Sequence, residues 1–154
     1  MALLFSYYKS VVLSMHRGIA QGSPSNAKPL LLLAIIKGIE EGSIIGNKIE
    51  FNESINNDYQ TLCNLFEPDR KAAPLFKPFY HSKREEYYNL KWKDGDLPVV
   101  PKGHTPSAKF LREHLDYAYL NDGLWEILQS QAARKEFKKL IIDNYLNTTT
   151  TPTI

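Results

Sequence analysis

Residues 27–42 read AKPLLLLAIIKGIEEG, and this stretch decides the fold because it holds a continuous apolar run. The pattern predicts a helix that starts near Pro29, with the proline in its first turn and Ser25 or Asn26 as its N-cap. Side chains from Leu30 to Ile36 are apolar on nearly every side, so we expect this helix at the centre of the core. Gly42 after Glu41 predicts where the helix ends.

Upstream of the central helix, apolar residues from Leu4 to Ile19 recur at helical spacing. This spacing predicts an amphipathic first helix that continues to about Ala20. The segment QGSPSN at residues 21–26 then separates it from the central helix, because Gly, Ser and Pro favour turns.

Downstream, Ile45, Ile49 and Phe51 are spaced as in a short strand around a turn at Gly46 and Asn47. Asn52 or Ser54 is expected to cap a third helix, which Pro68 ends. The order helix, helix, short strand, helix resembles a winged-helix arrangement.

The segment PLFKPFYHSKREEYYNLKW at residues 74–92 combines aromatic rings with several cations. Phe79, and then Tyr88, Leu90 and Trp92, alternate with polar residues. This alternation predicts two strands of a hairpin joined near residues 82–85.

Residues 93–107, KDGDLPVVPKGHTPS, are rich in Gly and Pro and predict a long loop. Ser107 is expected to open a helix through Leu115, Asn121 or Asp122 to begin another, and Ser130 to cap the last. The fold class expected from these elements is α+β, mostly helical with short strands, as a single winged-helix-like domain over residues 1–146. Residues 147–154, NTTTTPTI, predict a disordered tail or a truncated linker.

The chain has 154 residues, of which 43% are hydrophobic and 23% charged, as in an ordinary globular domain. The apolar run from Leu30 to Ile36 is too short to span a bilayer, and the N-terminus lacks the pattern of a signal peptide. The single cysteine, Cys63, lies on an apolar helix face and is expected in the core. The expected compartment is the cytoplasm.

Charge is concentrated in the middle of the chain. Residues 70–112 contain ten Lys and Arg against four Asp and Glu, whereas both flanking segments have more acids than bases. Such a field suits a polyanion such as nucleic acid, although a solvated basic loop would give the same composition.

Motifs for catalysis are missing from the sequence. The four histidines do not have metal-ligand spacing, and PDRK at residues 68–71 does not have the acid spacing of a metal-dependent nuclease. Neither a nucleophile elbow nor a glycine-rich phosphate loop is present. We therefore expect no catalytic residue, no metal and no cofactor in this chain.

Four segments taken in order resemble a known family. They are AKPLLLLAIIKGIEEG, PLFKPFYHSKREEYYNLKW, PSAKFLREHLDYAYLNDGLWEIL and ARKEFKKLIIDNYL. Their order resembles the N-terminal sulfur-binding domain of HNH restriction endonucleases, which cleave phosphorothioated DNA. The resemblance covers residues 23–146, and it implies a shallow apolar cavity for sulfur with basic residues around it.

The resemblance places the cavity proline at Pro78, the basic residue of the lysine-proline run at Lys28, and the helix arginine at Arg112. The sequence departs from the family at three positions: Lys77 stands where a tyrosine is frequent, His81 where a small residue is frequent, and Ala27 where a histidine is frequent. These changes keep the site positive but alter its apolar wall.

The first hypothesis is a specificity domain that binds phosphorothioated duplex DNA and performs no chemistry by itself. Its phosphate contacts would be Lys28, Lys77, Lys83, Arg84 and Arg112, and Pro78 with His81 would border the sulfur. The alternatives are DNA binding without sulfur selectivity, and a protein–protein interaction module in which the aromatic segment docks a partner.

Overall fold

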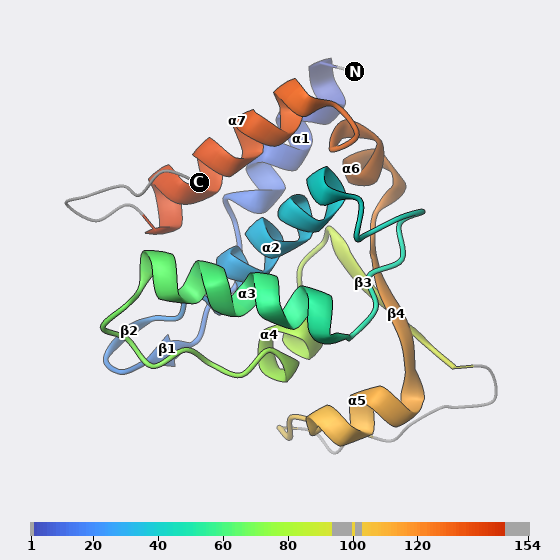
Figure 1. Cartoon of the computed structure of the whole chain (residues 1–154). Helices are drawn as coiled ribbons and strands as arrows, with labels where there is room; N and C mark the ends of the chain where they lie inside the picture. Colours follow the sequence, from blue (N-terminus) through green and yellow to red (C-terminus); the bar gives the residue numbers. More distant parts are fainter. Residues whose placement is uncertain (1, 94–99, 101–102, 147–154) are drawn as a thin grey trace.

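The computed structural model describes residues 2–93, 100 and 103–146 (Figure 1). The helical segments are α1 (Ala2–Val12), α2 (Ala27–Glu41), α3 (Glu53–Phe66), α4 (Phe76–His81), the 3₁₀ turn η1 (Ser82–Arg84), α5 (Ala108–His114), α6 (Asp122–Ile127), α7 (Gln131–Ile141) and the π-helical turn η2 (Ile142–Leu146). The strands are β1 (Ile19–Ala20), β2 (Ser23–Pro24), β3 (Tyr88–Trp92) and β4 (Leu115–Leu120). Together they confirm the predicted α+β class, but they do not confirm the winged-helix comparison.

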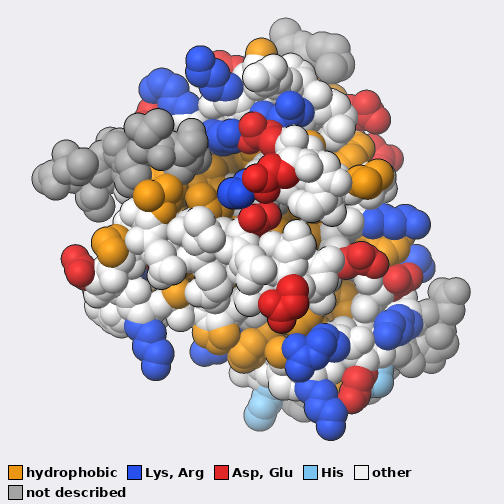
Figure 2. All heavy atoms as spheres, in the orientation of Figure 1, with side chains coloured by type: hydrophobic (Ala, Val, Ile, Leu, Met, Phe, Trp, Pro, Cys, Tyr) orange, Lys and Arg blue, Asp and Glu red, His pale blue; other side chains and the backbone are white. Residues whose placement is uncertain are grey.

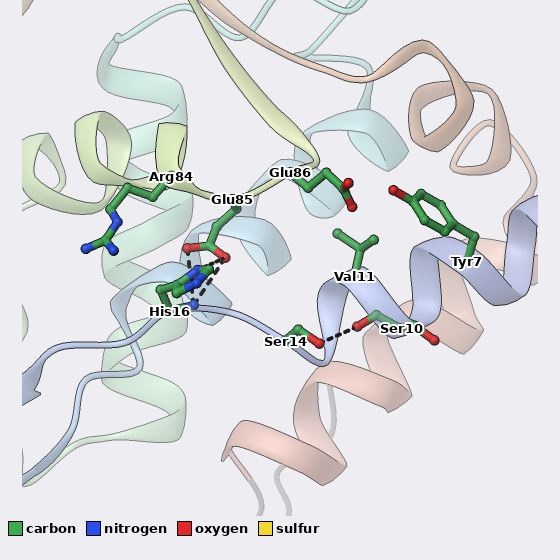
Figure 3. A pocket seen from close by; sticks show the side chains of 8 residues that line it. All are labelled: Tyr7, Ser10, Val11, Ser14, His16, Arg84, Glu85 and Glu86. Atoms are coloured by element: carbon green, nitrogen blue, oxygen red, sulfur yellow. Dashed lines mark hydrogen bonds and ion pairs between the residues drawn. The ribbon is translucent and has the colours of Figure 1, made fainter.

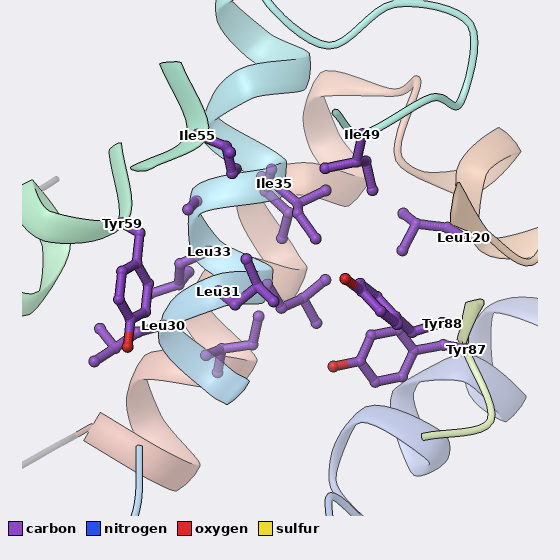
Figure 4. Packing of buried hydrophobic residues seen from close by; sticks show 14 of the residues in the cluster. Leu30, Leu31, Leu33, Ile35, Ile49, Ile55, Tyr59, Tyr87, Tyr88 and Leu120 are labelled. Carbon is purple, nitrogen blue, oxygen red and sulfur yellow. The ribbon is translucent and has the colours of Figure 1, made fainter. Parts of the chain in front are cut away.

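Helix α2 lies at the centre of the molecule, where it packs against α3, α4 and α7 (Figure 1). Every residue from Pro29 to Ile36 is buried, so the helix is apolar all round as predicted. Figure 4 shows Ile35 among other buried side chains, including Ile49 and Leu120. The helix ends at Gly42, whose φ of 79° is the left-handed conformation that glycine adopts without strain.

The first helix is shorter than the prediction of about Ala20, because it ends at Val12. The backbone N–H of Met15 donates to Tyr145 Oη at 3.2 Å, and the N–H of His16 donates to the Glu85 carboxylate at 3.2 Å. These tertiary hydrogen bonds replace the helical ones, so the chain turns away toward β1.

Asn52 caps α3 as predicted, since its side chain accepts a hydrogen bond from the Ile55 N–H at 3.1 Å. The predicted strand around residues 45–51 is wrong except at Ile49, which forms an isolated bridge with Ala118. The amide of Asn47 bonds both the N–H and the carbonyl of Leu120, at 2.9 and 2.8 Å. A side chain therefore makes contacts that a strand's backbone would otherwise make.

The predicted hairpin between Phe79 and Tyr88 is also wrong. Phe79 lies in α4, and β3 pairs antiparallel with β4 instead of with a neighbouring strand. The aromatic residues still reach the core: the Tyr88 hydroxyl donates to the Phe79 carbonyl at 2.6 Å, and both side chains are buried. Burial among apolar groups raises the pKa of the Tyr88 hydroxyl well above its ordinary value.

Side-chain caps at Ser107 and Ser130 start α5 and α7 as predicted, and Asn121 precedes α6. The helix from Ser107 stops at His114, because Leu115 already belongs to β4. Helix α5 continues directly into β4 and lies at the lower edge of the molecule (Figure 1). Most of the predicted loop at residues 93–107 and the predicted tail at residues 147–154 lie outside the described residues.

Cys63 is buried on α3, and burial raises the pKa of its thiol to about 11, so it is a core residue as predicted. Among the described residues, no helix combines the length and apolar character needed to cross a membrane.

Candidate nucleic-acid interface

A hollow of about 380 Å³ opens where three distant segments of the chain meet. One wall is formed by residues 16–20, which come after α1 in the chain and include β1. The second wall is the start of α2, and the third is α4 with η1. We call this hollow the basic pocket. Its lining residues are His16, Arg17, Gly18, Ile19, Ala20, Ser25, Ala27, Lys28, Ala73, Lys77, Pro78, His81 and Arg84.

Part of the pocket wall is apolar. Pro78 is buried in the first turn of α4, where the missing N–H of proline has no helical partner to lose. Ala27 and Ala73 add small side chains, and Ile19 is 72% exposed at the rim. The pocket therefore offers apolar surface to a ligand atom that is weakly hydrated.

Cations surround this apolar wall. The side chains of Lys77 and Arg84 are exposed and have no hydrogen-bond or ion-pair partner among the described residues. Arg17 donates to Asn26 Oδ1 at 2.8 Å and lies over the Tyr145 ring at 4.7 Å from its centroid, which fixes its direction. The pocket thus combines two free cations with one that is held in place.

Lys28 is held more tightly, because its ammonium group donates to Glu85 Oε2 and to the His16 carbonyl, both at 2.7 Å. Only 11% of the Lys28 side chain and 3% of the Glu85 side chain are exposed. Figure 3 shows the Glu85 carboxylate against His16, with Arg84 directed away on the opposite side. A buried acid therefore lies beneath a pocket whose rim is basic.

His81 completes the rim, and its Nε2 lies 2.7 Å from Thr105 Oγ1. Burial lowers the pKa of His81 below its ordinary value of 6.5, and the cations Lys28, Lys83, Arg84 and Lys77 lower it further. The neutral imidazole form of His81 is therefore favoured more strongly than in an ordinary histidine.

This lowered pKa predicts a pH dependence of anion binding. A bound phosphate favours the imidazolium form, so binding raises the pKa of His81 and takes up a proton. The affinity for a duplex oligonucleotide should therefore increase by about threefold between pH 7.5 and pH 5.5. Fluorescence anisotropy across this range measures the effect, and His81→Gln should remove the part that belongs to His81. An unchanged pH profile in that variant would contradict the assignment.

Arg70 holds the β1–β2 hairpin that forms one side of the pocket. Its guanidinium donates to the Ala20 carbonyl, and to the carbonyls of Ser23 and Pro24 at 3.1 Å each. It also pairs with Glu67 at 3.3 Å, and the turn between the strands has Gln21 and Gly22 at positive φ, 55° and 83°. A planar guanidinium suits several carbonyls at once in a way that an ammonium does not.

Removing this guanidinium is expected to loosen the hairpin. Arg70→Ala should lower the free energy of unfolding by about 1–2 kcal/mol and weaken DNA binding by about tenfold, because the wall bearing Ile19 is no longer fixed. Thermal unfolding and anisotropy measure the two effects. Lys71→Ala is the matched control, since it removes the same charge from the adjacent residue without the side-chain contact to the hairpin. Equal losses of affinity in both variants would show that only charge matters.

No known family profile matches the chain, and neither does any curated protein. Solved structures do match it. The sulfur-binding domain of ScoMcrA complexed with phosphorothioated DNA superposes with a TM-score of 0.68 at 16% identity, over 90% of this chain and 86% of that one. The chain has the sulfur-binding-domain fold.

Two longer structures contain the same fold. The sulfur-binding and SRA domains of ScoMcrA, complexed with phosphorothioated DNA, match with a TM-score of 0.70 at 16% identity. The Type IV phosphorothioation-dependent restriction endonuclease ScoMcrA matches with a TM-score of 0.67 at 15% identity. Each match covers 90% of this chain but only 42% and 29% of those chains, so this chain corresponds to less than half of either.

Within the sulfur-binding-domain fold, the basic pocket gathers five of the seven site residues predicted from the sequence: Lys28, Lys77, Pro78, His81 and Arg84. Lys83 is exposed on η1, outside the pocket lining, and its ammonium lies 4.7 Å from the centroid of the Tyr80 ring. These seven residues remain predicted contacts.

Arg112 lies elsewhere, in a hollow of about 470 Å³ formed by α3, the segment around Leu75, and α5. Figure 2 shows Lys and Arg side chains gathered over α5, at the lower edge of the molecule. Arg112 therefore lies apart from the basic pocket, in a different hollow of the surface.

Sequence reasoning missed the pocket residues contributed by the segment after α1, namely His16, Arg17, Ile19 and Ala20. It also missed Ala73 and the buried Glu85. The Gly and Pro residues around β1 and β2 are the only sequence signal that could have indicated the hairpin. Glu85 carries no local signal, because its burial depends on Lys28 and His16.

Proposed function

We propose that the chain binds duplex DNA that carries a phosphorothioate in its backbone. The modified linkage enters the basic pocket, where its sulfur contacts the apolar wall and the neighbouring phosphates contact the cations. The sulfur-binding-domain fold supports this proposal, because the ScoMcrA domain of that fold was solved with phosphorothioated DNA.

The observation that best supports the proposal is that an apolar wall and a basic rim meet in one pocket. Sulfur is larger and more polarisable than oxygen, so contact with Pro78 and Ala73 favours it. The linkage still carries a negative charge, which Lys77 and Arg84 neutralise. An apolar pocket alone would exclude the charge, and cations alone would not distinguish sulfur from oxygen.

Each predicted residue has a role in this proposal. Lys28, Lys77 and Arg84 contact the modified linkage and its neighbours, and Pro78 with His81 borders the sulfur. Lys83 and Arg112 lie outside the pocket, so they contact phosphates further along the duplex. Lys77 and His81 replace residues of the resembled family. Lys77 makes this pocket more positive, and both side chains make its wall less apolar.

We assign the chain the recognition step of an HNH-type restriction system that acts in the cytoplasm. It performs no chemistry by itself, and a nuclease domain outside this sequence would cleave the DNA. The assignment to an HNH nuclease follows from the order of the four resembling segments.

Fluorescence anisotropy with the full chain tests the proposal, using one duplex sequence with and without a single phosphorothioate and with each diastereomer separately. The modified duplex should bind at least tenfold more tightly. Binding should weaken steeply with salt, by about 0.9 in the logarithmic slope for each phosphate contact. Equal affinities would remove the sulfur assignment, and absence of binding at low salt would remove DNA binding altogether.

A further inference from the structure

The carboxylate of Glu85 is buried beneath the basic pocket, although its negative charge would oppose the binding of an anion there. Glu85 is 4% exposed and belongs to the short segment between η1 and β3. Its oxygens accept from the His16 N–H at 3.2 Å and from the Lys28 ammonium at 2.7 Å. His16 Nδ1 lies 3.3 Å from Oε1, so the carboxylate faces two possible cations and one backbone donor.

Lys28 therefore enters the binding site already paired. Its ammonium group has two acceptors, Glu85 Oε2 and the His16 carbonyl, and both lie within the protein. The opposite charge at 2.7 Å offsets much of the attraction that Lys28 would otherwise exert on a phosphate. Lys77 and Arg84, in contrast, have no such partner among the described residues.

We infer that Glu85 is a specificity-determining residue, which limits the attraction of Lys28 for ordinary phosphate and so leaves the choice between sulfur and oxygen to the apolar wall. This inference rests on the proposed function. Glu85 acts through Lys28 and His16, so it is a positioning residue and touches no DNA.

The physical reason lies in what an unpaired ammonium prefers. Ordinary and phosphorothioate diesters carry the same net charge, so charge alone does not separate them. A charged N–H donor makes its shortest and strongest hydrogen bonds to oxygen. A free Lys28 would therefore strengthen binding to every phosphate, and most of all to the unmodified ones that outnumber the sulfur.

The variant that tests this is Glu85→Gln, which keeps the shape of the side chain and one acceptor while it removes the charge. Anisotropy with the modified and ordinary duplexes should show ordinary DNA bound about fivefold more tightly, with a smaller gain for modified DNA. The logarithmic salt slope for ordinary DNA should become steeper, by up to about 0.9, because Lys28 without the opposite charge of Glu85 neutralises the phosphate that it contacts more fully.

Glu86→Gln is the matched control, because it makes the same charge change one residue further along. Glu86 is exposed and faces Tyr7 on α1, away from His16 (Figure 3). Its removal should shift both duplexes equally and leave the ratio of the two affinities unchanged. An equal shift in Glu85→Gln as well would overturn the inference, and so would an equal loss for both duplexes.

The outcomes separate this inference from the proposed function. If the wild type prefers modified DNA and Glu85→Gln keeps the same preference, only the role of Glu85 is overturned. Absence of discrimination in the wild type overturns the proposed function, and the inference with it. If Glu85→Gln does not fold, the double variant Lys28→Met with Glu85→Gln replaces it, since it buries no unpaired charge. In this double variant, the ratio of the affinities for modified and ordinary DNA should stay within about twofold of the wild-type ratio. A ratio near one would contradict the inference that Glu85 acts through Lys28.

Discussion

Replacing Lys77 and Arg84 together by alanine is expected to weaken binding to duplex DNA by about 100-fold at 0.1 M salt. Both side chains lie at the rim of the basic pocket and have no hydrogen-bond or ion-pair partner among the described residues. A charged hydrogen bond to phosphate contributes about 1.5–3 kcal/mol, which is at least tenfold for each residue. Both are exposed, so stability should hardly change.

The salt dependence makes this prediction specific. Loss of two phosphate contacts should reduce the logarithmic salt slope by about 1.8 for modified and ordinary duplexes alike. The control is the pair Lys48→Ala and Lys135→Ala, which removes the same charge outside the pocket. Anisotropy across a salt series measures both variants. If the control loses as much affinity as the pocket variant, Lys77 and Arg84 do not contact phosphate directly, and only the overall positive charge of the protein matters.

The second large effect concerns stability. Ile35→Ala should lower the free energy of unfolding by about 2–5 kcal/mol, because Ile35 is fully buried in α2 and its neighbours fill the space only in part. A loss of this size is a substantial part of the stability of an ordinary domain. Chemical denaturation followed by circular dichroism measures it.

Ile45→Ala is the control of the same residue type, and it should change the free energy of unfolding by less than about 0.5 kcal/mol. Ile45 is 76% exposed in the loop between α2 and α3. Similar losses in the two variants would mean that α2 is not the centre of the core (Figure 4).

The sequence predicted the elements whose signals are local. Asn52, Ser107 and Ser130 cap helices through hydrogen bonds within three residues, and Gly42 ends α2 with a conformation that glycine favours. The apolar run in α2 needs no partner to be recognised. These features can be predicted because cause and effect lie in the same short segment.

Features that depend on distant partners were mispredicted. The first helix ends early because Tyr145 and Glu85 take the N–H groups of Met15 and His16. Strand β3 pairs with β4, which follows α5 in the chain, whereas alternation alone favoured pairing with the nearer segment around Phe79. For the candidate site, the sequence indicated the residues of α4 and η1, but not the β1 wall or Glu85. Only the fold brings those groups to the pocket.

We expect the β1–β2 hairpin to give the pocket a lower resistance to heat than the core. Each of its strands has two residues, and side-chain hydrogen bonds from Arg70 and Gln21 join this segment to residues 70–71. A ribbon of that size opens by itself at a small free-energy cost, while α2 stays packed. On warming, the basic pocket should come apart while the helical body keeps its native structure, so measured helicity should overstate the fraction of molecules in which the pocket is intact.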